Sequence, residues 1–123
     1  MTRKELIKFC LTMPGVYEDY PFNDDNWAVI RHRKNSKIFA WIYCRNQKLC
    51  INVKEEPMQA KFWRKMYRGV EAGYHLNKEH WNTITVDMDV PLQELYGMIK
   101  NSYRLTSPRQ PVKSRKGQED TAE

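Results

Sequence analysis

The sequence is short of the residues and spacings on which most enzyme sites depend. It has only five glycines in 123 residues, and neither GxGxxG nor a GxxxxGK motif that would cradle nucleotide phosphates. No serine or cysteine stands in a nucleophile elbow such as GxSxG. The three cysteines, Cys10, Cys44 and Cys50, lack the close pair spacing of a zinc site. We therefore expect reduced, packing cysteines in a non-enzymatic protein with no cofactor and no metal.

Long hydrophobic runs are also missing. No segment approaches the roughly 20 apolar residues of a membrane helix, and the N-terminus does not resemble a signal peptide. Hydrophobic residues make up 41% and charged residues 29%, which is typical of a globular domain. We expect a soluble, cytoplasmic, monomeric protein without membrane contact. Residues 1–105 are predicted to form one domain, and residues 106–123, rich in Pro, Ser and mixed charge, a flexible tail.

Acidic residues are absent from one long stretch of the chain. The net charge is +6, which favours an anionic partner without showing one. Between Asn26 and Lys54 there is no Asp or Glu, and seven basic residues occur: Arg31, Arg33, Lys34, Lys37, Arg45, Lys48 and Lys54. The positive charge is thus segregated in the folded part of the chain.

The hydrophobic pattern predicts an α+β fold with an antiparallel sheet. Thr2 and Glu5 fit a capping box at the start of a first helix. Apolar residues at helical spacing predict helices over 3–13, over 55–67 and from Pro91 onward. Three runs rich in β-branched and aromatic residues, separated by short polar turns, predict a meander of strands over 27–33, 38–44 and 49–54, with a fourth strand over 83–87.

The pattern assigns the faces of one of these strands and leaves those of another open. Leu49, Ile51 and Val53 alternate with more polar neighbours, which predicts one buried and one wetter face for that strand. The middle strand is apolar on both faces. Its residues Phe39, Trp41 and Tyr43 are therefore left open between the core and an exposed aromatic surface.

The segment from Gly73 to Thr83, with the sequence GYHLNKEHWNT, is dense in polar and aromatic residues. One interpretation is a ligand or metal site around His75, Glu79 and His80, but a five-residue spacing does not place two ligands on one helical face. We favour a structural loop held by hydrogen bonds, in which replacing either histidine lowers stability. Its residues are Gly73, Tyr74, His75, Asn77, His80, Trp81 and Asn82. The acidic residues Glu18, Asp19, Asp24 and Asp25 lack the spacing of a calcium loop and are interpreted as a solvated loop.

Several segments together resemble the MmcQ/YjbR family. They are Tyr20-Pro21-Phe22, residues 37–40, residues 51–54, the block from Gly73 to Thr83, and Asn101-Ser102-Tyr103. The resemblance covers about residues 2 to 105. It implies a CyaY-like, or frataxin-like, two-layer fold with the N- and C-terminal helices on one face of the sheet. It also implies DNA binding through a double-wing arrangement. The first helix lacks the acidic character linked to iron binding in frataxins, so iron handling is not supported.

The leading functional hypothesis from the sequence is DNA binding of low sequence specificity. Two basic turns, expected to project side by side, would contact phosphates through Arg31, Arg33, Lys34, Lys37, Arg45 and Lys48. A first alternative is a protein-interaction module that uses the open sheet face with Trp41 and Tyr43. A second is the ligand or metal site at His75 and His80.

Overall fold

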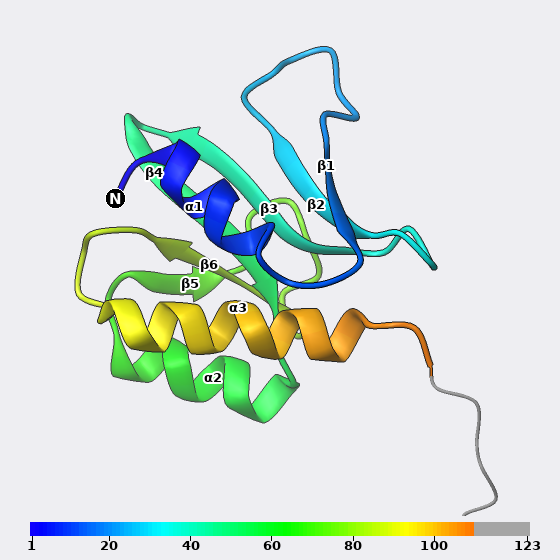
Figure 1. Ribbon diagram of the computed structural model, residues 1–123. Coiled ribbons are helices and arrows are strands. Elements are labelled where there is room, and N and C mark those ends of the chain that lie inside the picture. Colours follow the sequence, from blue (N-terminus) through cyan, green and yellow to red (C-terminus); the bar gives the residue numbers. More distant parts are fainter. Residues whose placement is uncertain (110–123) are drawn as a thin grey trace, which may run out of the picture.

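The computed structural model describes residues 1–109, which form a six-stranded antiparallel sheet and three helices (Figure 1). The strand order in the sheet is β1-β2-β3-β4-β6-β5. The elements, in chain order, are α1 (Arg3–Cys10), β1 (Val16–Asp19), β2 (Ala28–His32), β3 (Ile38–Arg45), β4 (Lys48–Lys54), α2 (Pro57–Met66), β5 (Val70–Ala72), β6 (Trp81–Thr85) and α3 (Leu92–Thr106). The predicted α+β, two-layer fold is confirmed.

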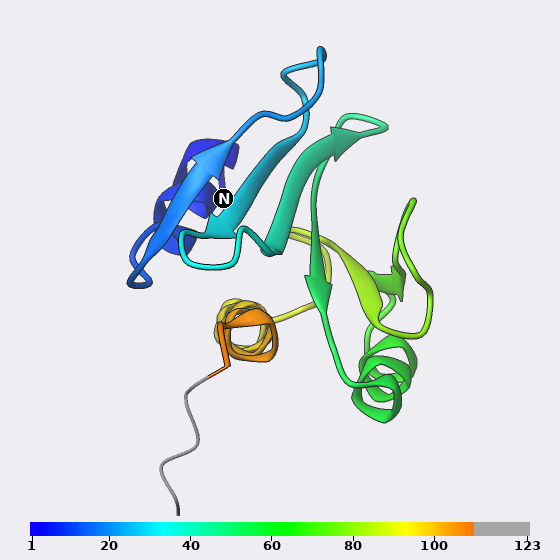
Figure 2. The ribbon, with the colours of Figure 1, turned by 90° about the vertical axis from the view of Figure 1, so that its right-hand side faces the viewer.

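The helices cover one face of the sheet and leave the other face without a helix (Figure 2). α3 lies under β3 and β4, α1 contacts β3, and α2 packs against β5 and β6. The hydrophobic core between the two layers includes Leu6 and Cys10 from α1, Leu95 and Ile99 from α3, and Ile42 from β3. This one-sided cover makes the opposite face of the sheet available for a site.

The predicted meander is confirmed, and the structure adds two strands that the sequence did not predict. β1 and β5 have four and three residues, too few for a periodic pattern, and they form the two edges of the sheet. The capping box of α1 is present, since Thr2 Oγ1 accepts from the Glu5 amide and Glu5 accepts from the Thr2 amide. The predicted helix over 3–13 ends earlier, at Cys10.

A β-bulge in β3 decides on which side of the sheet the Phe39 side chain lies. Ile30 pairs with Ala40 and Arg31 with Ile38, so Phe39 is an extra residue in its strand. It packs against His32 and against Tyr103 of α3. Phe39 is therefore a core residue on the helical side.

The two basic turns lie at opposite ends of β3, not side by side as predicted. One turn joins β2 to β3, and the other, Asn46 and Gln47, joins β3 to β4. β3 is eight residues long, and at ~3.3 Å per residue the turns are roughly 25 Å apart. Because successive hairpins in an antiparallel meander reverse direction, one compact ligand cannot contact both turns.

The C-terminal end of α3 belongs to the folded domain. Thr106, which the sequence placed at the start of the tail, is buried. Its hydroxyl lies 2.8 Å from His32 Nε2, and its carbonyl accepts from Asn35. The rest of the predicted tail, from residue 110, lies outside the described residues.

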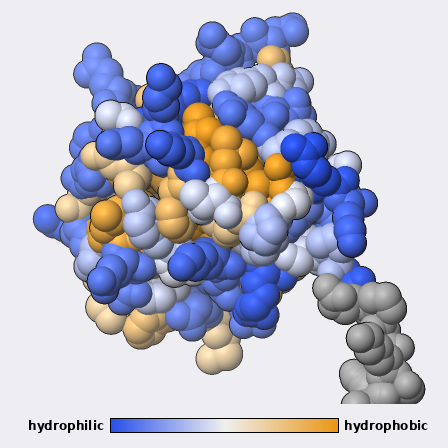
Figure 3. Space-filling view, viewed as in Figure 1, coloured by the Kyte–Doolittle hydropathy of each residue, from blue (hydrophilic) through white to orange (hydrophobic). Residues whose placement is uncertain are grey.

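Figure 3 shows the helical side of the molecule, where hydrophilic residues surround an apolar patch near α1 and a second apolar area toward the left of the view. Among the helices of residues 1–109, none is both long and apolar enough to cross a membrane.

Candidate functional site: an aromatic pocket on the open face of the sheet

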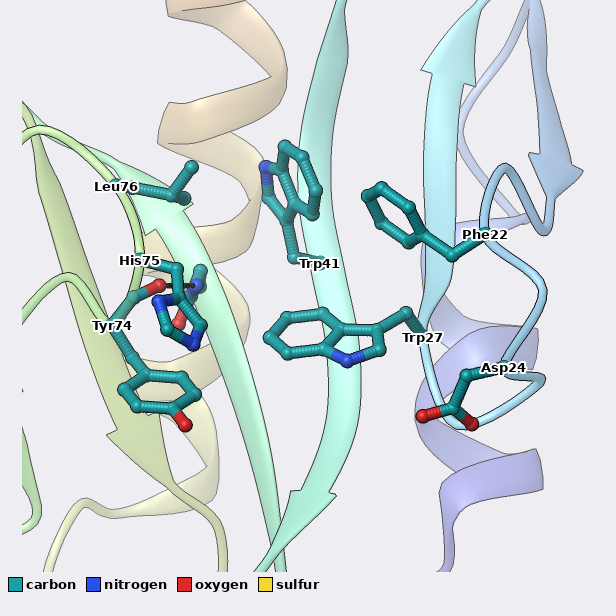
Figure 4. A pocket seen from close by; sticks show the side chains of 8 residues that line it. Phe22, Asp24, Trp27, Trp41, Tyr74, His75 and Leu76 are labelled. Carbon is teal, nitrogen blue, oxygen red and sulfur yellow. Dashed lines mark hydrogen bonds between the residues drawn. The ribbon is translucent and has the colours of Figure 1, made fainter.

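A pocket of about 380 Å³ opens on the sheet face that carries no helix (Figure 4). Four separate segments line it: the loop between β1 and β2, β3, β4, and the loop between β5 and β6. Its lining residues are Phe22, Asp24, Trp27, Trp41, Asn52, Tyr74, His75 and Leu76. We call this the aromatic pocket.

Three rings form the walls of the aromatic pocket. The centroids of Phe22, Trp27 and Trp41 lie 6.3 to 6.4 Å from one another. Phe22 and Trp41 are within 22° of parallel, whereas Trp27 is turned by 78° and 87° from them. Phe22 and Trp41 thus form two nearly parallel walls of the pocket, and Trp27 forms a third wall roughly perpendicular to them.

Tyr43 supports the pocket from beneath and does not line it. The side chain is 0% exposed, because Trp27 stacks on it with ring centroids 4.1 Å apart. Burial raises the pKa of Tyr43 to about 12. The sequence suggested that Trp41 and Tyr43 could contact a partner on the open face. This prediction is corrected for Tyr43, which is buried, whereas Trp41 lies in the wall of the pocket.

Asn52 connects the floor of the pocket to its neighbours. Its Oδ1 accepts from the Tyr43 hydroxyl at 2.8 Å and from the Thr83 hydroxyl at 2.6 Å, and its Nδ2 donates to the Tyr74 carbonyl at 3.1 Å. The predicted wetter face of β4 is wrong here, since Asn52 is completely buried. The aromatic side chains and the loop after β5 exclude water from it.

The segment from Gly73 to Thr83, which comprises the loop between β5 and β6 and the first residues of β6, brings Tyr74 and His75 to the pocket. Gly73 approaches Trp81 so closely that an added Cβ would lie 2.8 Å from the Trp81 Cβ. Its amide donates to the Trp81 carbonyl at 2.8 Å. His75 follows with a positive φ of 64°, a conformation often found at functional sites in residues other than glycine. The His75 ring packs on Tyr74 at 4.0 Å.

The hydrogen bonds predicted for this loop are confirmed for its asparagines. Asn77 Oδ1 accepts from the amides of Glu79 and His80, and Asn82 Nδ2 donates to the Ala60 carbonyl of α2. The imidazoles of His75 and His80 are instead exposed and make no hydrogen bond to residues 1–109. Within the same part of the chain, no three His, Cys, Asp or Glu side chains gather as metal ligands would.

Trp41 in the pocket wall carries a buried polar group without a partner among residues 1–109. Trp41 Nε1 is buried and has no hydrogen-bond acceptor among the described residues. Figure 4 shows this nitrogen on the side of Leu76, away from Phe22. A buried N–H without an acceptor costs about 1–3 kcal/mol, and such groups in native proteins are often functional.

The basic residues predicted as phosphate contacts do not form one surface. Arg31 pairs with Asp19 at 2.9 Å, and Arg45 pairs with Glu71 at 3.2 Å. The Arg45 guanidinium also lies 4.3 Å from the ring centroid of Tyr74. Three predicted residues are exposed at the turn between β2 and β3, namely Arg33, Lys34 and Lys37, and Lys48 is exposed at the other end of β3.

A second hollow, of about 370 Å³, lies between α2 and α3 and holds a buried carboxyl group. Glu55 is 1% exposed and precedes α2, whereas the sequence predicted it as the first residue of that helix. Its Oε1 accepts from Asn101 at 3.0 Å, and its Oε2 has no partner among residues 1–109. Burial raises the pKa of Glu55 to about 7.

The fold and the pocket together define a small α+β protein with helices on one face of a single sheet and an aromatic pocket on the other. The YjbR family model matches residues 11–105. The chain is 28% identical over 116 residues to the uncharacterised protein YjbR of Escherichia coli K12, covering 94% of this chain and 96% of that protein. It is 30% identical over 117 residues to the uncharacterised protein YyaQ of Bacillus subtilis, covering 86% and 98%.

Solved structures show the same architecture. Protein DR2400 of Deinococcus radiodurans, which has a DUF419 domain, matches with a TM-score of 0.79 and 28% identity over 94% of this chain and 85% of that chain. A Pseudomonas syringae protein matches with a TM-score of 0.78 and 26% identity over 87% and 100%. The chain belongs to the YjbR family.

Proposed function

We propose that this chain is a non-enzymatic binding protein that holds a compact organic ligand in its aromatic pocket. The observation that carries the proposal is the hollow of about 380 Å³ walled by Phe22, Trp27 and Trp41. Small-molecule sites are typically apolar hollows of about 300–1,000 Å³ with a few polar groups. The polar groups of this lining are the exposed side chains of Asp24 and His75.

The pocket is largely preformed, which favours binding because few groups need to be ordered. Trp27 is held by Tyr43, and Tyr43 is held by Asn52. Phe22 is the exception, since it is 50% exposed on the loop between β1 and β2. Its movement would let a ligand enter.

Nuclear magnetic resonance of the indole N–H groups tests this proposal. The chain has four tryptophans, of which Trp27 and Trp41 line the pocket while Trp63 and Trp81 do not. Tetramethylammonium, phenol and cyclohexanol are titrated in turn as an ammonium, an aromatic and an aliphatic probe. The proposal expects at least one probe to shift the signals of Trp27 and Trp41 selectively. It is wrong if no probe does so.

Two variants complete the experiment. Trp41→Ala removes a wall of the pocket and should abolish the shift of the Trp27 signal. Phe62→Ala is the matched control, since Phe62 is an exposed aromatic residue on α2 outside the pocket. The protein-interaction alternative also uses Trp41, but the hollow accommodates one compact group, so we place a small ligand first.

DNA binding is the second candidate function. It is favoured by the exposed cluster of Arg33, Lys34 and Lys37 at one turn, whose lysines have no ion pair within residues 1–109. Because this cluster is small, about three phosphate contacts are expected. Binding of this kind would be weak, salt-dependent and of low sequence specificity.

A further inference from the structure

The three rings that form the walls of the aromatic pocket are close enough together for one cation to lie within cation–π distance of all three centroids. The ring centroids of Phe22, Trp27 and Trp41 form a nearly equilateral triangle with sides of 6.3 to 6.4 Å. A positive group about 3 Å above the centre of this triangle lies about 5 Å from each centroid, inside the ~6 Å range of cation–π attraction. A neutral group in the same place gains only dispersion and apolar contact.

The charges around the pocket also favour a cation. Asp24 lines the pocket, and in Figure 4 its carboxylate lies near Trp27, on the side of that ring away from Phe22 and Trp41. The nearby positive charge of Arg45 is paired with Glu71. The Arg45 guanidinium also lies over the ring of Tyr74, 4.3 Å from its centroid, so one aromatic ring of the pocket lining already contacts a cation.

The shape of the pocket indicates which cation fits. Facing rings 6.3 Å apart are too close to admit a planar ring stacked on both walls, which needs about 3.5 Å on each side. A rounded group that lies above the triangle of ring centroids does not have to fit between the two parallel rings. The three rings offer no acceptors for the N–H groups of a primary ammonium, which would depend on the Asp24 carboxylate, whereas a methylated ammonium needs no acceptor.

We infer that the aromatic pocket binds a small solute that carries a methylated ammonium group. The positive group sits over Phe22, Trp27 and Trp41, with Asp24 as its counter-charge. The inference rests on the proposed function and adds the chemical class of the ligand.

Calorimetric titration with choline and with 3,3-dimethyl-1-butanol tests the inference. The second compound has the same shape, with a carbon atom in place of the charged nitrogen. We expect choline to bind at least about tenfold more tightly, because cation–π attraction to three rings is lost in the neutral compound. If the two compounds bind equally, the pocket selects shape, and the inference is overturned while the proposed function stands.

A matched pair of variants isolates the role of the charge. Asp24 Oδ1 accepts from the Asn26 amide at 2.8 Å, and Asp24→Asn keeps an oxygen for this turn while it removes the charge. It should weaken choline binding about threefold to tenfold, whereas Asp25→Asn, outside the pocket lining, should not. Equal effects of the two variants would overturn the assignment of Asp24.

A peptide with trimethyl-lysine gives the last arm of the test. The inference expects it to bind no more tightly than choline. Affinity more than tenfold higher would overturn the assignment to a small solute in favour of a protein partner. If choline binds to no site that shifts Trp27 or Trp41, the inference fails, while phenol and cyclohexanol still decide the proposed function separately.

Discussion

The indole ring of Trp27 lies on the ring of Tyr43, with centroids 4.1 Å apart and an angle of 21° between the planes. Trp27 stands in the wall of the pocket, while Tyr43 is buried beneath it and donates to Asn52 at 2.8 Å. The wall is therefore fixed by a buried hydrogen-bond network.

Removal of the centre of this network should destabilise the protein strongly. Asn52→Ala leaves the hydroxyls of Tyr43 and Thr83 and the carbonyl of Tyr74 without their partner, so we expect a loss of about 3 kcal/mol in unfolding free energy. Tyr43→Phe removes only one hydroxyl and should cost about 1 kcal/mol. Urea denaturation measures both, with exposed Asn23→Ala as the control. Equal costs for Asn52→Ala and Asn23→Ala would contradict the network.

Glu55 makes stability fall as the pH rises. Its pKa is raised from 4.5 to about 7 in the folded state, so between these values the folded state binds a proton that the unfolded state has released. Stability from this group is complete below about pH 4.5 and is lost by about pH 7, with a total of about 3 kcal/mol.

The variant Glu55→Gln removes this dependence. It should match the wild type near pH 4.5 and be more stable by about 3 kcal/mol at pH 8, because no charge has to be buried. Thermal melting over this pH range measures the difference, and exposed Glu56→Gln is the control. A difference between Glu55→Gln and the wild type that stays constant with pH would show that Glu55 keeps its ordinary pKa.

The two histidines of the loop should differ from its asparagines. His80→Ala removes an exposed imidazole and is expected to change the unfolding free energy by less than about 0.5 kcal/mol. Asn77→Ala removes the acceptor for two amides and should cost about 1 kcal/mol. Chemical denaturation of both variants checks this order, and the reverse order would restore the structural role that the sequence predicted for His80.

DNA binding, if present, should depend on one turn. We expect the slope of log affinity against log salt to be about −3, and Lys34→Gln with Lys37→Gln should reduce its magnitude by about two. The control pair Lys61→Gln and Lys65→Gln lies on the exposed side of α2. Fluorescence anisotropy at several salt concentrations measures the slope. Equal slopes for both pairs, or no binding at low salt, would contradict this candidate function.

The sequence predicted those elements whose pattern is local. The capping box at Thr2 and the three strands of the meander follow from neighbouring residues, and the structure confirms them. β1 and β5 were missed because each has four residues or fewer and depends on pairing with β2 and β6. Their strand conformation comes from the sheet and not from their own composition.

The pocket could be predicted only in part, because its walls come from distant segments. The second apolar face of β3 indicated an aromatic surface, and Trp41 lies there. Phe22 and Tyr74 reach the same place through loops that carry no signal of their contact. The stretch from Asn26 to Lys54, which has no acidic residue, was misleading for the same reason. It suggested basic side chains that are free to contact phosphates, whereas Arg31 and Arg45 form ion pairs with carboxylates on β1 and β5.

The most direct measurement of the central claim is the nuclear Overhauser effect between a bound solute and the tryptophan rings. In a sample saturated with choline, we predict cross-peaks from its methyl protons to the ring protons of Phe22, Trp27 and Trp41, and none to Trp63 or Trp81. Cross-peaks to Trp63 or Trp81 alone, or none to any aromatic ring, would contradict the assignment of the aromatic pocket as a site for methylated ammonium groups.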